Sequence, residues 1–284
     1  MKVFVVIATL LLAFIGPSWA DGSETFPFRV GEKLTYQIFW GPFVAGRATL
    51  EVQDIEPVGG HDCYHLIARA WTSGLADLLF HVDSTTESWL DVDQLFSRRY
   101  LENRVEGKRT RSNETIYDYD HHTTINTNLV NGRATCQELD QPVQDVVSSL
   151  YYVRVLRLKP DVANKFVINA DGANYVMNVT PDLRKSLWVR PLGDVEALRI
   201  EPQPTLNIVA ANHGRMWFWL SDDNLKMPLL VSTDMKIGTA RLVLYKIEAE
   251  TPVASDTANP GFTPDQSESG PDNTEAGTAG ENTR

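Results

Sequence analysis

Apolar and polar residues alternate along most of the central part of the chain, and glycine, proline, aspartate and asparagine interrupt the alternation. The first such segment, residues 33–40, places four apolar side chains on one face: Leu34, Tyr36, Ile38 and Trp40. Successive side chains of a β-strand point to opposite faces, so this pattern predicts a strand with one buried face. Gly41 and Pro42 end it.

Similar short segments, rich in β-forming residues, recur towards the C-terminus. They predict further strands in residues 46–52, 61–71, 82–90, 95–107, 110–120, 123–128, 165–169, 174–180, 185–189 and 194–200. Residues 215–247 then predict a closing meander of strands, with a polar turn at residues 221–224. Asn131-Gly132 is a hairpin signal, because both residues tolerate a positive φ, and Asp171-Gly172 predicts another turn.

Helical periodicity is confined to two places. The single main helix is predicted after Pro142, where an apolar stripe at helical spacing consists of Val146, Val147, Leu150, Tyr151 and Val153. Lys159-Pro160 ends this helix. Residues 73–80 predict one further helical turn, with Ser73 as its cap and Leu75, Leu78 and Leu79 on one face.

Roughly twelve predicted strands against one main helix indicate an all-β fold. Strands that follow one another through short turns pair in antiparallel fashion. We therefore predict an antiparallel β-barrel or half-barrel, in which a curved sheet packs around the helix. A doubly wound α/β fold would need a helix between successive strands, and the sequence lacks that alternation.

The two ends of the chain differ from its centre. Residues 1–20 combine Met1-Lys2, an apolar block and a small-residue site, which predicts a signal peptide cleaved after Ala20. Residues 251–284 are mainly Pro, Ser, Thr, Gly and acidic residues, and such a segment buries too little apolar surface to fold. We expect one β-barrel-like domain in residues 21–250, followed by a disordered acidic tail in residues 251–284.

Charge and hydropathy limit the location and the partners of the protein. The apolar block near the N-terminus is shorter than the roughly 20 residues that cross a bilayer, so we expect a periplasmic protein that does not span the membrane. The formal net charge is −11 at pH 7, which argues against a basic surface for nucleic acid. The acidic tail offers a tether to an envelope protein partner.

Cysteine and histidine supply one pattern of metal-ligand type. His61, Cys63 and His65 would share one face of a strand, and imidazole and thiolate bind zinc or copper. The pattern lacks a fourth ligand, so we predict no metal and keep these three residues as a weak candidate. In an oxidising compartment Cys63 and Cys136 are available for a disulfide, although their spacing leaves open whether they meet.

Known catalytic and cofactor motifs are missing from the sequence. There is no Gly-x-Ser-x-Gly elbow, P-loop, dinucleotide fingerprint or calcium-binding loop, so we predict no catalytic residue and no cofactor. Carboxylate pairs such as Asp83 with Glu87, or Asp222 with Asp223, leave glycan hydrolysis open as an alternative. Their spacing is equally typical of turn and surface residues.

Tryptophan is the residue type that points most clearly to ligand binding. Six tryptophans lie in or beside predicted strands. Trp188 is one of them, and the other five are the binding candidates: Trp40, Trp71, Trp89, Trp217 and Trp219. On the concave face of a curved sheet these side chains would hold an apolar chain or stack on sugar rings. The alternative is that they fill the core.

Several short motifs, in their order and spacing, resemble a bacterial family known only as domain of unknown function 3108. The stretches that carry the resemblance are residues 31–36 (GEKLTY), 71–90, 117–119 (YDY), 145–154 (DVVSSLYYVR) and 219–223 (WLSDD). The resemblance covers residues 29–248 and implies an exported envelope protein with a β-barrel or half-barrel similar to periplasmic lipoprotein carriers. It implies no activity. The family pattern favours Asp-Pro where this chain has Asp145-Val146, which leaves the helix start open by one turn.

Together these observations predict a periplasmic binding, carrier or scaffold protein of the cell envelope rather than an enzyme. The leading expectation is a lipid or other apolar ligand, or a glycan, held by the curved sheet. A glycan hydrolase that uses paired carboxylates is the alternative.

Overall fold

The computed structural model describes residues 26–160, 162–204, 215–235 and 238–249, all within one compact unit. The predicted signal peptide at residues 1–20 and the predicted tail at residues 251–284 lie outside the described residues. Across the described ranges, neither helix has the length and apolar character needed to cross a membrane.

The described chain consists of short strands joined mostly by tight turns, with two helices. In chain order the elements are β1 (Glu32–Trp40), β2 (Phe43–Val58), β3 (His61–Thr72), α1 (Leu75–Leu79), β4 (Val82–Asp91), β5 (Ser97–Glu106), β6 (Arg109–Asp118), β7 (Thr123–Asn128), β8 (Ala134–Glu138), α2 (Val146–Val155), β9 (Asn164–Ala170), β10 (Ala173–Val179), β11 (Pro181–Val189), β12 (Gly193–Ile200), β13 (Gln203–Pro204), β14 (Met216–Ser221), β15 (Pro228–Met235) and β16 (Gly238–Ala249). The predicted all-β class is confirmed.

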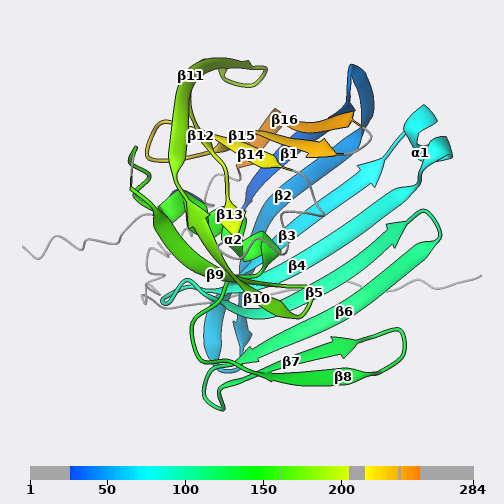
Figure 1. The fold of residues 1–284 in the computed structure, drawn as a ribbon, viewed down its shortest axis with the longest axis vertical. Coiled ribbons are helices and arrows are strands. Elements are labelled where there is room, and N and C mark those ends of the chain that lie inside the picture. The colour runs from blue at the N-terminus through cyan, green and yellow to red at the C-terminus, as the bar shows by residue number, and fades with distance from the viewer. Residues whose placement is uncertain (1–25, 161, 205–214, 236–237, 250–284) are drawn as a thin grey trace, which may run out of the picture. The chain divides into compact units, whose positions relative to one another are not determined.

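One large antiparallel sheet dominates the fold. Its thirteen strands follow the order β11-β12-β14-β15-β16-β1-β2-β3-β4-β5-β6-β7-β8, and β13, β10 and β9 form a second, small sheet. The large sheet curves strongly, and α2 lies on its concave side with β9 and β10 (Figure 1). Because β11 and β8 are its two edges, the sheet is a half-barrel around a helix, as the sequence predicted.

The inward-facing residues of β2, β3 and β4 hold α2 against the sheet. Val147 and Tyr151 of the helix pack on Val52, Leu66 and Leu90. All five side chains are buried. Complete burial of one such aliphatic side chain contributes about 1.5–3 kcal/mol, so this cluster is a main source of the attachment of α2.

The second half of strand β14 packs on apolar residues with both of its faces. Trp219 packs on one side with Leu34 and Leu229, whereas Phe218 and Leu220 pack on the other side with the cluster that includes Val153 of α2. A strand covered on both faces needs apolar residues at consecutive positions, not at alternate ones. This explains the continuous aromatic run that opens the closing meander.

A buried carboxylate holds the N-terminus of α2. Asp145 precedes the helix, and its Oδ1 accepts hydrogen bonds from the backbone N–H groups of Val147 (2.7 Å) and Ser148 (2.8 Å). Its Oδ2 accepts hydrogen bonds from the hydroxyls of Ser88 on β4 (2.5 Å) and Ser97 on β5. Burial raises the pKa of Asp145, and the four hydrogen bonds oppose that rise. One side chain therefore caps the helix and ties it to two strands.

Arg154 holds the C-terminal end of the same helix. Its guanidinium is 1% exposed and donates to Glu32 Oε1 of β1 at 2.5 Å. It also donates to the backbone oxygens of Pro27 (2.5 Å) and Leu225 (3.2 Å). Removal of one partner from a buried ion pair typically costs about 3–5 kcal/mol, because the other charge is left unpaired. Arg154 thus joins the helix to β1, to the segment before it and to the loop between β14 and β15.

Two sequence predictions about the helices need correction. The Asp145 cap places the start of α2 at Val146, yet Val146 is 47% exposed, and the buried face includes the polar residues Ser148 and Arg154 instead. An apolar stripe cannot predict buried residues that are satisfied by hydrogen bonds and ion pairs. In α1 the N-cap is Gly74, not Ser73, and no side chain caps the helix.

The first hairpin is also tighter than predicted. Strand β2 begins at Phe43, so Gly46 lies inside the strand, opposite Thr72 of β3. A Cβ atom at this position would collide with the backbone oxygen of Trp71. Gly46 therefore serves a close approach of two strands, not a turn.

The Asp145 contacts predict a specific loss of stability. In Asp145→Ala we expect the free energy of unfolding to fall by about 3 kcal/mol, because the variant loses a helix cap and two buried hydroxyls lose their acceptor. Asp145→Asn keeps the cap, so its loss should be about half as large. Urea unfolding followed by circular dichroism measures both.

The matched control for this prediction is Asp140→Ala, which changes an exposed aspartate shortly before α2. We expect its unfolding free energy to stay within about 0.5 kcal/mol of the wild type. An Asp145→Ala variant as stable as this control would show that the carboxylate does not hold the helix.

Candidate functional site

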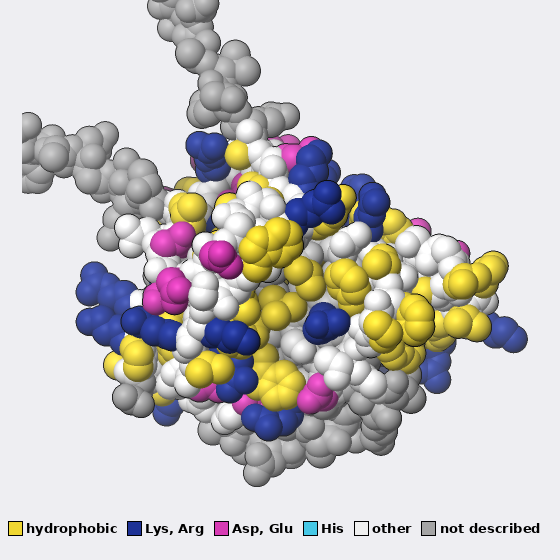
Figure 2. All heavy atoms as spheres, turned by 90° about the horizontal axis from the view of Figure 1, so that it is seen from above, with side chains coloured by type: hydrophobic (Ala, Val, Ile, Leu, Met, Phe, Trp, Pro, Cys, Tyr) yellow, Lys and Arg dark blue, Asp and Glu magenta, His cyan; other side chains and the backbone are white. Residues whose placement is uncertain are grey.

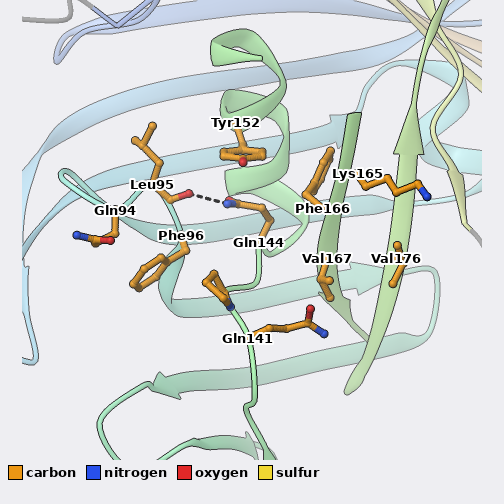
Figure 3. Close-up of a pocket in the computed structure, with 11 residues that line it drawn as sticks. Gln94, Leu95, Phe96, Gln141, Gln144, Tyr152, Lys165, Phe166, Val167 and Val176 are labelled. Atoms are coloured by element: carbon orange, nitrogen blue, oxygen red, sulfur yellow. Dashed lines mark hydrogen bonds between the residues drawn. The ribbon is translucent and has the colours of Figure 1, made fainter. Parts of the chain in front are cut away.

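A cavity of about 470 Å³ opens between the β4–β5 loop, the segment that leads into α2, and strands β9 and β10 (Figure 3). This volume falls within the roughly 300–1,000 Å³ of small-molecule sites. The walls come from segments far apart in the sequence: Gln94 to Phe96, Gln141, Pro142, Gln144, Tyr152, Lys165 to Val167, and Val176. The cavity is the candidate functional site.

Aromatic rings and amide side chains make up most of the lining. Phe96, Tyr152 and Phe166 supply the rings, and Tyr152 meets Phe166 edge to face with 5.2 Å between their centroids. Glutamines at positions 94, 141 and 144 supply amides. Rings provide apolar stacking surfaces and amides both donate and accept hydrogen bonds, so the lining suits a ligand with ring faces and polar groups.

Gln144 is the most constrained residue of the lining. Its backbone bridges to β9, with its N–H donating to Val167 O (2.8 Å) and its carbonyl accepting from Asn169 N–H (2.7 Å). Its side-chain Nε2 donates to Leu95 O at 2.6 Å (Figure 3). The side-chain Oε1 is buried and has no hydrogen-bond partner. An unpaired buried acceptor costs about 1–3 kcal/mol, so this oxygen lowers the stability of the cavity wall.

The β9–β10 hairpin continues from the cavity over the polar part of the concave face. Asp171 and Gly172 form its two-residue turn with φ values of 50° and 73°, which confirms the predicted turn. Arg111 of β6 donates to Asp171 at 2.7 Å, and Gln137 of β8 donates to the carbonyl of Gly172 at 2.7 Å. These contacts dock the tip of the hairpin on the sheet.

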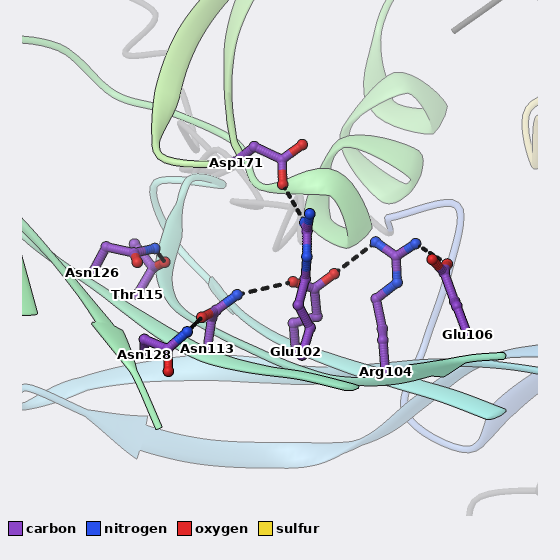
Figure 4. A network of polar contacts seen from close by, with 9 residues as sticks. Glu102, Arg104, Glu106, Asn113, Thr115, Asn126, Asn128 and Asp171 are labelled. Carbon is purple, nitrogen blue, oxygen red and sulfur yellow. Dashed lines mark hydrogen bonds and ion pairs between the residues drawn. The ribbon is translucent and has the colours of Figure 1, made fainter. Parts of the chain in front are cut away.

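Beneath this hairpin the concave face carries a network of polar side chains (Figure 4). Arg104 of β5 donates to Glu102 at 2.8 Å and also to Glu106. Asn113 of β6 donates to Glu102 at 3.4 Å and accepts from Asn128 of β7 at 3.2 Å. Glu102 and Glu106 both pair with Arg104, so the two carboxylates lie on either side of one guanidinium and are held in ion pairs.

The carboxylate pairs suggested by the sequence are engaged elsewhere. Glu87 points to the outer face and contacts His65 Nε2 at 2.7 Å. Asp223 accepts hydrogen bonds from the Ser221 hydroxyl (2.6 Å) and from the backbone N–H of Leu225 (2.9 Å), as expected of a turn residue. Neither residue lines the cavity.

The five candidate tryptophans do not share a binding face. Trp219 is a core residue, and Trp89 and Trp71 lie on the outer face of the sheet, opposite α2. Trp40 is 40% exposed at the end of β1, and Trp217 is half-buried under Arg215. None of them lines the cavity, whose rings come from phenylalanine and tyrosine. Aromatic content alone could not identify the site, because alternation does not say which face of a strand is covered.

An exposed apolar patch surrounds α1. Leu75, Leu78 and Leu79 are 80%, 83% and 86% exposed, and Phe80 and Phe43 are 52% and 75% exposed. Hydrophobic side chains gather on this side of the molecule in the view from above (Figure 2). The three leucines share a face of the helix as predicted, but nothing within the described residues covers them.

The cysteines do not form the disulfide that the sequence left open. Cys63 lies in β3 and Cys136 in β8, with four strands of the sheet between them. Strands are about 4.8 Å apart, so five steps separate the two residues by roughly 24 Å along the sheet, whereas disulfide Cα atoms lie about 4.4–6.8 Å apart. Both thiols are free. The His61, Cys63 and His65 triad is not assembled either, because Cys63 Sγ contacts His61 O at 3.4 Å and His65 turns to carboxylates.

The sequence comparison agrees with this architecture. Residues 35–245 match the model of a family described as "Protein of unknown function (DUF3108)". The chain belongs to this family. The resemblance carried by the motifs in residues 29–248 is therefore confirmed. No protein with a curated description matches the chain.

One solved structure supports the fold of this DUF3108 protein. A β-barrel-like protein of domain of unknown function DUF1849 from Brucella abortus has a TM-score of 0.52 at 9% identity, over 78% of this chain and 98% of that one. A provisionally named lipoprotein from Parabacteroides distasonis (6% identity, 78% and 97% coverage) and a provisionally named exported protein with a YmcC-like fold from Bacteroides fragilis (7%, 78% and 97%) both have TM-scores of 0.29. Only the first value is high enough to indicate a shared fold.

The free thiols lead to a labelling prediction. Burial raises the pKa of Cys63 to about 11, and its side chain is inaccessible, whereas Cys136 is exposed. Because the thiolate is the reactive form, we expect the native protein at pH 8 to react with one equivalent of a thiol reagent, at Cys136. The unfolded protein should react with two. Mass spectrometry of the labelled chain locates the sites. If neither the native nor the unfolded protein reacted, Cys63 and Cys136 would be joined in a disulfide, and this would contradict the separation of β3 and β8.

Proposed function

We propose that the protein is an exported binding protein of the cell envelope that holds a hydroxyl-bearing ligand of the glycan class in the cavity beside α2. The observation that carries this proposal is the lining of the cavity, in which three aromatic rings lie beside three glutamine side chains. A ligand hydroxyl would exchange hydrogen bonds with the amides of Gln94 and Gln141, which are exposed. The rings of Phe96, Tyr152 and Phe166 would stack on the apolar faces of sugar rings.

The rigidity of the cavity supports a binding role. Gln144 is held at its backbone by β9 and at its amide nitrogen by the carbonyl of Leu95. Asp145, the next residue, is fixed by Ser88 and Ser97. A site whose polar groups are already oriented loses little conformational freedom when a ligand binds, and this raises affinity.

The cellular location in this proposal rests on the N-terminal sequence pattern, with its apolar block and its small-residue site before Asp21. A binding role is favoured over glycan hydrolysis by the polar side chains of the cavity, which are glutamine amides, the Tyr152 hydroxyl and Lys165. The lining includes no carboxylate, and cleavage of a glycosidic bond requires two of them.

A lipid or other apolar ligand is the second candidate, and the exposed patch around α1 favours it. Apolar patches of this kind mark surfaces that contact lipids or partners. The two candidates use different residues, so one experiment separates them.

The ligand class is tested by calorimetric titration of the mature protein with N-acetylglucosamine disaccharide, maltose and a lysophospholipid. We expect a saccharide to bind, and Gln141→Met to weaken that binding about tenfold, the equivalent of one hydrogen bond of about 1.4 kcal/mol. Gln37→Met, on β1 away from the cavity, is the matched control and should bind like the wild type.

The outcomes distinguish the candidates. Lysophospholipid binding that survives Gln141→Met would replace the glycan ligand by an apolar one. Saccharide binding with equal affinity in the wild type and in Gln141→Met would place the site elsewhere. If neither class of ligand binds, the proposed function is wrong for both classes.

A further inference from the structure

A β-bulge in β2 changes which of its residues face outward. Val52 is fully buried against α2, on the concave face. The register with β3 shifts between Val52 and Asp54, so Asp54 pairs with His65 and Glu56 pairs with Cys63. One extra residue in a strand redirects the side chains that follow it. Asp54 and Glu56 thereby lie on the outer face, together with His65.

Three atoms of metal-ligand type converge at this bulge. His65 Nδ1 lies 3.4 Å from Glu56 Oε1 and 3.6 Å from Asp54 Oδ1. The three atoms all lie within 4.8 Å of one another. In a tetrahedral zinc site with bonds of about 2.0–2.2 Å, two ligand atoms are separated by about 3.4 Å. The observed distances match atoms that share a metal ion better than atoms that share a proton, which lie about 2.7–3.2 Å apart.

Two of these atoms have no hydrogen-bond partner. His65 is 6% exposed, and both its Nδ1 and Asp54 Oδ1 are buried and unpaired. The two atoms lie 3.6 Å apart, which is within the range of an ion pair, but their contact is not a hydrogen bond. Buried polar atoms are nearly always satisfied, and an ion between them would satisfy both.

Neighbouring side chains orient the group. His65 Nε2 lies 2.7 Å from Glu87 Oε2, and the indole N–H of Trp89 donates to Glu56 Oε2 at 2.8 Å. The Trp89 ring stacks on the imidazole, with 4.6 Å between centroids. A histidine that binds a metal through one nitrogen usually donates its other N–H to a carboxylate. With Glu87 accepting from Nε2, the lone pair of Nδ1 faces Asp54 and Glu56.

The local charge also favours a cation. Within the described chain no lysine or arginine forms an ion pair with Asp54, Glu56 or Glu87. Arg99 is close, over the Trp89 ring, but its guanidinium pairs with Glu114 at 2.6 Å. Three carboxylates therefore surround one imidazole.

We propose that Asp54, Glu56 and His65 bind a divalent transition-metal ion, with Zn²⁺ as the best match. One imidazole nitrogen and two carboxylate oxygens form a donor set that zinc accepts, with water at the fourth position. The Asp54 and Glu56 side chains are 47% and 43% exposed, so solvent reaches that position. The site lies on the outer face of the sheet and does not depend on the proposed ligand cavity.

The test is a calorimetric titration of the mature, untagged protein with ZnCl₂ after treatment with a chelator. We expect one Zn²⁺ per chain. Asp54→Asn and Glu56→Gln, which preserve shape and act on partly exposed residues, should each weaken binding at least tenfold. Asp62→Asn, an exposed aspartate of β3, is the matched control and should bind zinc like the wild type. Circular dichroism shows whether each variant is folded.

Two further measurements exclude other zinc ligands and examine the coordination. Cys136→Ser must retain the binding, because Cys136 is the exposed thiol. Co²⁺ in place of zinc should give the intense visible absorption of a four-coordinate ion, and Glu56→Gln should reduce it. Absent zinc binding, equal affinity in Asp54→Asn and Glu56→Gln, or loss of binding in Cys136→Ser would each overturn the proposal.

Discussion

The buried polar contacts at the two ends of α2 are the constraint on which the rest of the structure depends. A helix of ten residues is too short to be stable alone in water, so it must be held by its surroundings. Asp145 ties its start to Ser88 and Ser97, and Arg154 ties its end to Glu32. Between these points, Val147 and Tyr151 complete the core under the curved sheet. The fold is thus a half-barrel that packs on a helix, and polar contacts hold this helix at both ends.

The same attachment creates the cavity. Gln144 directly precedes the Asp145 cap, and its backbone bridges to β9, so the position of α2 also sets the position of the small sheet. Tyr152, on the exposed side of the helix, faces Phe166 of β9. The stretch 145–154, which carried much of the family resemblance, therefore combines a cap, a core face, a cavity wall and a buried arginine. The polar residues in this stretch have structural roles that its apolar pattern does not reveal.

Sequence reasoning succeeded where a feature depends on near neighbours in the chain. Alternation identified β1, and Asp171-Gly172 identified the β9–β10 turn. It failed where a feature depends on distant segments. The cavity joins Phe96, Gln144 and Phe166 from three separate regions. The β2 bulge adds a single residue within a strand that still alternates, so His65 was grouped with Cys63 and not with Asp54. Trp89 sits on the outer face yet is 4% exposed, because His65 and Arg99 cover its two sides.

Amide hydrogen exchange, measured residue by residue on the free protein, tests most directly whether α2 is held as part of the core. If the contacts at Asp145 and Arg154 pin the helix, its amides should exchange as slowly as those of β3 and β4, because only global unfolding exposes them. Exchange of the α2 amides through a local opening, well before those of β3 and β4, would contradict the claim that the helix and the sheet form one cooperative unit.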